Sequence, residues 1–129
     1  MFVKDVEKLK SFLGTQSELR GDLTVTGILR LDGNASGKIQ ADEVILSATA
    51  VMNGDVVARK IIVEGRVEGS LRASDLVEIG SKGKVKGDIY TNKLVVIEGG
   101  EFNGRIEMKA DKLNVLDFES KSQEISLKR

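Results

Sequence analysis

EFNGRIEM, residues 101–108, carries the pattern that decides the fold: an apolar residue, a polar one, glycine, a polar one and a second apolar residue. The same frame occurs six times in the 129-residue chain, at intervals of 16, 17, 15, 18 and 17 residues. Such a period indicates a repeat architecture. The six glycines are Gly21, Gly37, Gly54, Gly69, Gly87 and Gly104.

The residues around each glycine alternate between apolar and polar. The residues two before and two after it are all apolar, and those directly beside it are polar or are charged. A period of two is typical of a strand with one buried face. The glycine suits a bend that needs positive φ or a close backbone approach. The apolar residues are Leu19, Ala35, Met52, Val67, Val85 and Phe102 before the glycine, and Leu23, Ile39, Val56, Leu71, Ile89 and Ile106 after it.

A second apolar pair follows in every unit, again with strand spacing. Units this short cannot bury an apolar face alone, but stacked units share a continuous core. We therefore predict an all-β solenoid of about six turns, roughly 29 Å long at about 4.8 Å per strand. The pairs are Leu29 and Leu31, Val44 and Leu46, Ile61 and Val63, Val77 and Ile79, Leu94 and Val96, and Leu113 and Val115.

An antiparallel sandwich or small barrel is the alternative fold, because it also contains many short strands joined by glycine turns. Such a fold does not require the same frame at every second strand. Two-residue hairpin turns are also scarce: Asp32-Gly33 and Asn53-Gly54 both lie inside the repeat frame.

Composition argues against most enzyme classes. The chain has neither His nor Cys, which removes the usual general base, the thiolate nucleophile and the commonest metal ligands. Twenty acidic and twenty basic residues cancel, so no overall field favours nucleic acid. We expect a non-enzymatic, cytoplasmic protein without cofactor or metal. A hexapeptide-repeat acyltransferase, whose coils are near 18 residues and whose catalytic residue is His, fits neither the spacing nor the composition.

The two ends of the chain depart from the repeat. Residues 1–13, MFVKDVEKLKSFL, place apolar residues at helical spacing and are predicted to be an amphipathic tail. Residues 14–116 are predicted to be the solenoid domain. Residues 117–129 are polar and charged, and we expect a flexible tail there.

The chain resembles the bactofilins, a family of bacterial polymer-forming cytoskeletal proteins. The resemblance covers roughly residues 13–116 together with the opening Met1-Phe2-Val3-Lys4. It implies a right-handed β-helix of triangular cross-section that joins end to end into filaments without nucleotide. It also implies a scaffold at the inner face of the cell membrane that recruits cell-wall enzymes and shapes the cell. The stretches that carry it are LRLDGNASGKI (29–39), IIVEGRVEGSL (61–71), KVKGDIYTNKLVVIEGG (84–100) and EFNGRIEM (101–108).

The polymer contact is predicted at the first and last turns, since the ends of a solenoid expose unpaired strand edges. An interaction module that does not polymerise, with its ends capped by the terminal segments, is the alternative. For Phe102, an end contact and a core position under the following residues both remain open. The candidates are Leu19, Leu23 and Val25 at one end and Phe102, Ile106 and Met108 at the other.

The N-terminal tail has two interpretations. By resemblance to membrane-binding bactofilins, Phe2 and Val3 insert into the membrane while Lys4 meets anionic headgroups. The acidic Asp5 and Glu7 weaken that interpretation. In the second interpretation, the segment folds over the first turn and covers its open edge.

Overall fold

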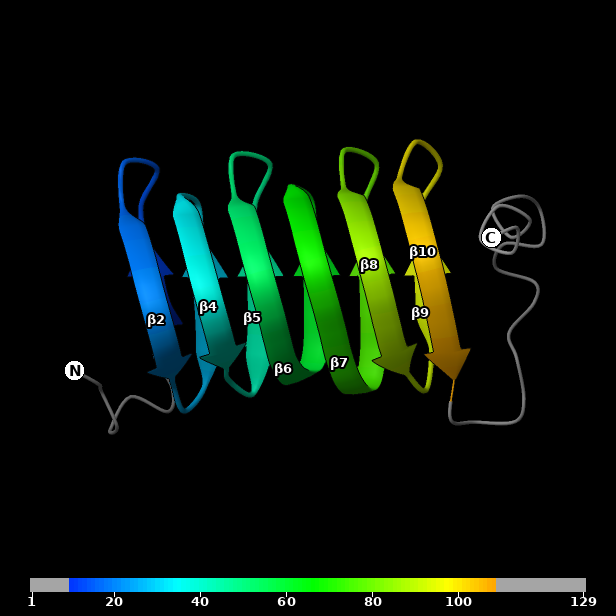
Figure 1. The fold of residues 1–129 in the computed structure, drawn as a ribbon, viewed down its shortest axis with the longest axis horizontal. Helices are drawn as coiled ribbons and strands as arrows, with labels where there is room; N and C mark the ends of the chain where they lie inside the picture. The colour runs from blue at the N-terminus through cyan, green and yellow to red at the C-terminus, as the bar shows by residue number, and fades with distance from the viewer. Residues whose placement is uncertain (1–9, 109–129) are drawn as a thin grey trace.

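The structure is a computed structural model that describes residues 10–108, and all of its regular elements there are β-strands. The strands wind into one solenoid of about six turns (Figure 1). They are β1 (Lys10–Leu13), β2 (Glu18–Thr24), β3 (Ile28–Leu31), β4 (Asn34–Gln40), β5 (Glu43–Leu46), β6 (Val51–Val63), β7 (Arg66–Ile79), β8 (Lys84–Thr91), β9 (Leu94–Val96) and β10 (Glu101–Met108).

Every pairing among the described strands is parallel and joins one coil to the next. The six glycines of the repeat lie in one register, from Gly21 to Gly104. In Figure 1 the front strands run downward and the back strands upward as the chain advances to the right, so the solenoid is right-handed. The predicted solenoid is confirmed, and the antiparallel sandwich or barrel is wrong.

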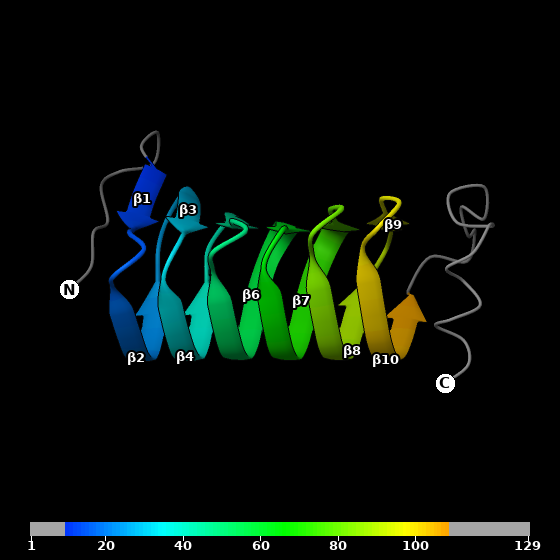
Figure 2. The same cartoon turned by 90° about the horizontal axis from the view of Figure 1, so that it is seen from above.

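Each coil has three straight segments, which form three faces of the solenoid. The first face holds the residues before the repeat glycine and the second holds those after it. The third face consists of β1, β3, β5, residues 60–63 of β6, residues 76–79 of β7, and β9. Seen from above, the bends between the first two faces line up along one edge (Figure 2).

The bend between the first and second faces requires glycine. Gly54 has φ of 134°, a conformation that residues with a Cβ rarely adopt. A Cβ built on Gly54 would also overlap the carbonyl oxygen of Gly37 in the preceding coil. Conformation and close stacking therefore both explain why glycine returns at this position.

The irregular spacing of the repeat arises at the other two corners. The turn before the first face is short at Asp32-Gly33 but has four residues at 47–50, where Ala50 N donates a hydrogen bond to Ser47 O at 2.9 Å. At the corner before the third face, Ala58 and Ala73 stay paired although one more residue separates Ala73 from the next paired position. Because both corners project outward, they absorb the difference in length without changing the register of the core.

The core is a narrow column of stacked aliphatic side chains. Inward residues of successive coils lie directly above one another, as the paired Ile39 and Val56 do. Five of the six predicted second apolar pairs, from Leu29 and Leu31 to Leu94 and Val96, line the core from the third face, as predicted. The sixth predicted pair, Leu113 and Val115, lies outside the described residues. The inward residues with no exposed surface include Leu31, Ile39, Val44, Leu46, Met52, Val56, Ile61, Val63, Leu71, Val77, Ile79 and Ile89.

The ends of the domain differ from the predicted boundaries where they can be compared. Lys10–Leu13, predicted as part of the tail, forms β1 and pairs with β3. Leu13 lies in register with Leu31, so it is the first residue of a core column. The rest of the N-terminal segment, residues 109–116 and residues 117–129 lie outside the described residues.

Candidate polymer interface

The two ends of the solenoid carry unpaired strand edges. Among the described strands, β2 pairs only with β4, and β10 pairs only with β8. On the third face, β1 and β9 also have one partner each. Such edges present free N–H and C=O groups that can pair with another chain. The strand edges at the two ends of the solenoid are therefore the backbone surfaces best suited to pair with another chain.

At the N-terminal end, the core columns reach the surface. Leu19 and Leu23 are half-buried and pack against the core, whereas Ala35 and Ile39, one coil further in, are 3% and 0% exposed. The difference arises because no coil covers β2 from outside in the described residues. Two of the three predicted contact residues at this end thus present apolar surface there.

Val25, the third predicted residue at this end, lies in different surroundings. Its side chain is only 5% exposed, and its N–H donates to Gln40 O at 2.9 Å. Val25 therefore belongs to the core and offers little free surface. Its position four residues after Gly21 does not by itself reveal this burial.

At the C-terminal end, Ile106 and Met108 are half-buried and pack against the core, whereas the residues below them, Ile89 and Thr91, are 0% and 4% exposed. Phe102 is 9% exposed and stacks on Val85 in the same column. The structure thus brings the three residues together on β10.

Two further residues extend these end surfaces. Leu13 at the N-terminal end and Val96 at the C-terminal end are half-buried and pack against the core. Val96 was already in a predicted apolar column, so its place at an end follows from that column. Leu13 was missed because its alternation with Ser11 is too short to stand out from the helical spacing of residues 1–13.

The outer walls of the first two faces are mostly polar and have opposite charges stacked along them. Arg105 Nε lies 3.8 Å from Asp88 Oδ1, and Ser70 Oγ donates to Asp55 Oδ1 at 2.8 Å. All four lie in one outward line, directly after the repeat glycines. Because Arg105 is largely exposed, its ion pair with Asp88 contributes about 0–1 kcal/mol. That line is Asp22, Lys38, Asp55, Ser70, Asp88 and Arg105.

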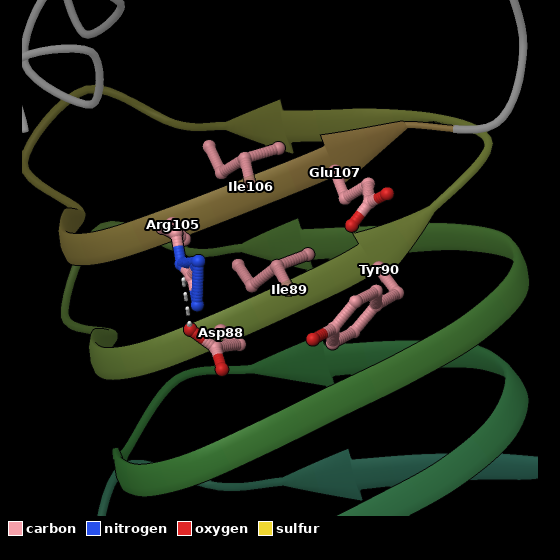
Figure 3. A pocket seen from close by; sticks show the side chains of 6 residues that line it. All are labelled: Asp88, Ile89, Tyr90, Arg105, Ile106 and Glu107. Atoms are coloured by element: carbon pink, nitrogen blue, oxygen red, sulfur yellow. Dashed lines mark ion pairs between the residues drawn. The ribbon is translucent and has the colours of Figure 1, made fainter.

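A shallow depression lies on the outer wall between β8 and β10 (Figure 3). The Asp88 and Arg105 ion pair closes one side of it. The inward-facing residues that line it are Ile89, which belongs to the core, and Ile106, which packs against the core. The depression follows the spacing between the two stacked strands. Its lining consists of Asp88, Ile89, Tyr90, Arg105, Ile106 and Glu107.

Among the residues that the structure describes, the pKa of Asp32 departs from its ordinary value. A side-chain hydrogen bond from Ser47, and then one from Arg30, hold the pKa of Asp32 below its usual value of 3.8. Arg30 Nε lies 3.0 Å from Asp32 Oδ1. Asp32 lies in the turn that follows β3, and its carboxylate accepts hydrogen bonds from Arg30 of β3 and from Ser47 of the next coil.

Within residues 10–108, no group of three or more acidic, His or Cys residues is placed to hold a metal ion. The same part of the chain has no helix long and apolar enough to cross a membrane.

These features define the class: a three-sided, right-handed parallel β-solenoid in which no other strand of residues 10–108 covers the apolar core and the strand edges at either end. The sequence profile described as "Bactofilin: Polymer-forming cytoskeletal" matches residues 11–107. The chain therefore belongs to the bactofilin family, and it is a polymer-forming cytoskeletal protein.

Two curated relatives, both from Myxococcus xanthus (strain DK1622), are similar to this chain. Bactofilin BacO is 28% identical over 97 residues, which are 74% of this chain and 77% of BacO. Bactofilin BacP is 28% identical over 97 residues, which are 74% of this chain and 40% of BacP. No solved structure matches the chain.

Proposed function

We propose that this bactofilin assembles end to end into filaments through its first and last turns, without bound nucleotide. The observation that carries the proposal is that, within residues 10–108, the apolar core continues to both ends of the solenoid without a covering coil. Leu19 and Leu23 at one end and Ile106 and Met108 at the other are half-buried, although the residues one coil inside are buried. Stacking a second molecule on either end covers this apolar surface and pairs the free strand edges.

The glycine-rich stretch before β10 supports assembly without nucleotide. Gly100 N donates to Ile97 O at 2.8 Å, and Gly104 bends β10 with φ of 147°. These glycines serve turns of the solenoid. The stretch also lacks the Lys-Ser/Thr ending of a phosphate-binding loop.

Arginine at an end position tests the end contact. Ile106→Arg places a charge in the half-buried C-terminal end, so we expect filaments to disappear while the protein remains soluble and rich in β structure. Asn103→Arg is the matched control, because it adds the same charge to the same strand on its exposed outer side. Electron microscopy of both variants, with and without nucleotide, measures the outcome.

Two results would contradict the end contact. The first is filaments of normal length from Ile106→Arg, and the second is loss of filaments from Asn103→Arg to the same degree. Leu23→Arg repeats the test at the opposite end. Phe102→Arg is less informative alone, because Phe102 is only 9% exposed and its replacement endangers the fold. A monomeric wild type under all conditions would favour the capped interaction module.

We further propose that the filaments lie at the inner face of the cell membrane and there organise cell-wall enzymes or cell shape. Phe2, Val3 and Lys4 are the proposed membrane contact. Support comes from their apolar and basic character and from the family resemblance. These three residues lie outside the described part of the structure.

Co-sedimentation with anionic vesicles tests the membrane contact. We expect Phe2→Glu and a deletion of residues 2–9, which leaves β1 intact, to lose vesicle binding while keeping filaments. Vesicle binding at the wild-type level by the deletion variant would refute the anchor. Filaments that are lost together with binding would instead indicate that the segment supports the end of the solenoid.

A further inference from the structure

The third face differs from the other two in what it exposes. Its outward positions form two columns, and six of these residues are large and apolar. Phe12 is 60% exposed, and the others are half-buried. By contrast, all twelve residues beside the repeat glycines on the first two faces are polar or charged. Column one is Lys10, Ile28, Glu43, Lys60 and Leu76, and column two is Phe12, Arg30, Ile45, Ile62, Glu78 and Val95.

The order of residues in column two is self-complementary when it is reversed. Consider a twofold axis that is parallel to the strands and lies between β5 and β6. It sets the first coil of one copy, which contains Phe12, against the sixth coil of a second copy, which contains Val95. Arg30 then faces Glu78. The apolar residues Ile45 and Ile62 face each other at the centre, and the remaining two apolar residues meet at the ends.

Column one shows the same complementarity independently. The same axis sets Ile28 against Leu76, so that apolar surface meets apolar surface. It also sets Glu43 against Lys60, which have opposite charges. Two adjacent columns thus match under one operation over the four inner coils, from Ile28 and Arg30 to Leu76 and Glu78. In the outermost coils the same axis sets the position of Lys10 in column one against that of Lys93, which directly precedes β9, so like charges are opposed at this one position.

The alternative in which both rods point the same way is unfavourable. An axis along the rod and beneath column two would set Arg30 against Arg30 and Glu78 against Glu78. Like charges brought together in an interface cost several kcal/mol. An axis between the two columns would instead set Arg30 against Ile28 and Glu78 against Leu76, so that each charge is covered by an apolar residue and has no opposite charge. The charge pattern of this face therefore selects the antiparallel arrangement.

The charges of column two are available for this contact. Arg30 bonds Asp32 through Nε, which leaves both terminal guanidinium nitrogens for a second carboxylate, and its side chain is 47% exposed. Glu78 has no ion pair among the described residues. In column one, Glu43 Oε2 lies 4.0 Å from Arg59 of the next coil, a loose contact that leaves room for another cation.

We propose that the third face binds the third face of a second copy of this chain, with the two rods antiparallel. The contact is small: six strands at about 4.8 Å, each presenting a few residues at about 3.3 Å, offer only a few hundred Å² per copy. Stable interfaces usually bury at least about 1,000 Å² in total. Single copies therefore pair weakly. Filaments pair strongly because many contacts act together. This last step rests on the proposed end-to-end assembly.

A charge exchange tests the predicted register. In Arg30→Glu, two acidic residues face each other, and in Glu78→Arg two basic residues do. We expect each variant to form single filaments but to lose filament pairs. The double variant again places opposite charges against each other at positions 30 and 78, with the signs exchanged, and should restore the filament pairs. Lys86→Glu, an exposed charge reversal on the first face, is the matched control and should keep the pairs.

Electron microscopy separates this inference from the proposed function. Absence of all filaments in the wild type counts against end-to-end growth. Single filaments without pairs, or pairs that are equally abundant in both single variants, overturn the lateral contact. Failure of the double variant to pair overturns the register.

Cross-linking tests the contact without filaments. The chain has no cysteine, so engineered ones are unique. Mixed Ile45→Cys and Ile62→Cys proteins, each also carrying Ile106→Arg, should form heterodimers with a short bis-maleimide linker. They should form faster than a mixture of Ser36→Cys and Asn53→Cys in the same background. These control positions occupy adjacent coils of the first face.

The cross-linking outcomes are decisive. A rate equal to that of the control mixture overturns the proposal. Cross-linking that appears only after deletion of residues 2–9 also overturns it, and assigns the face to the chain's own N-terminal segment.

Discussion

Interior and terminal coils share one sequence pattern, but their surroundings differ. Gly54 and Gly21 both bend the chain at positive φ, 134° and 115°. A Cβ on Gly54 would overlap the backbone of the preceding coil, whereas a Cβ on Gly21 would meet no atom within 4 Å. The repeat therefore specifies the shape of a coil. Its place in the stack decides whether a residue holds the core together or faces outward.

The largest effect is expected for Gly54→Ala. The added methyl group combines backbone strain, about 1–3 kcal/mol, with steric overlap against Gly37. We expect loss of the cooperative unfolding transition in circular dichroism, or a large fall in its midpoint. Gly21→Ala carries only the strain and should remain folded. Equal destabilisation by the two substitutions would show that conformation alone requires the glycine.

A smaller difference between interior and terminal coils is expected when an apolar side chain is replaced by alanine. Ile61 has no exposed surface, so Ile61→Ala should reduce the free energy of unfolding by about 2–5 kcal/mol. Ile106 is half-buried, and Ile106→Ala should cost about 1 kcal/mol in the monomer. Urea denaturation measures both.

The effect of protein concentration on stability should differ between these two substitutions. If the end is covered in filaments, the cost of Ile106→Ala should rise with concentration, because assembly stabilises the folded state. The cost of Ile61→Ala should not change. A concentration-independent cost at both positions would argue against burial of the C-terminal end.

The smallest effect concerns acid stability at a turn between coils. Because the folded-state pKa of Asp32 is lowered, its charge stabilises the fold above the unfolded value near 3.8, and this contribution is lost as pH falls through the folded pKa. Asp32→Asn should therefore be less stable than the wild type near neutral pH, and its free energy of unfolding should fall less steeply as the pH is lowered. Ser47→Ala should act in the same direction. An acid limb unchanged in both variants would contradict the assignment.

Much of the interior was predictable, because strand alternation and the glycine frame leave one stacking that buries both apolar pairs. Three residues at the ends show where prediction stopped. Leu13 begins a core column, yet helical spacing with distant residues concealed it. Val25 was predicted at an exposed end and lies 5% exposed. Phe102 has an apolar column below it, but sequence does not show what lies above.

The sequence by itself determined the glycine bend of the coil, the apolar columns and the approximate number of turns, because these follow from local alternation repeated at a near-constant interval. The three-sided cross-section was expected only from the family resemblance. The tertiary structure decided which coil each residue joins and therefore what surrounds it. Only stacking aligns Arg30, Ile45, Ile62 and Glu78 into one outward column, and only stacking distinguishes an open end from a covered interior. Sequence spacing cannot show either property, because contacts between coils depend on register across turns of unequal length.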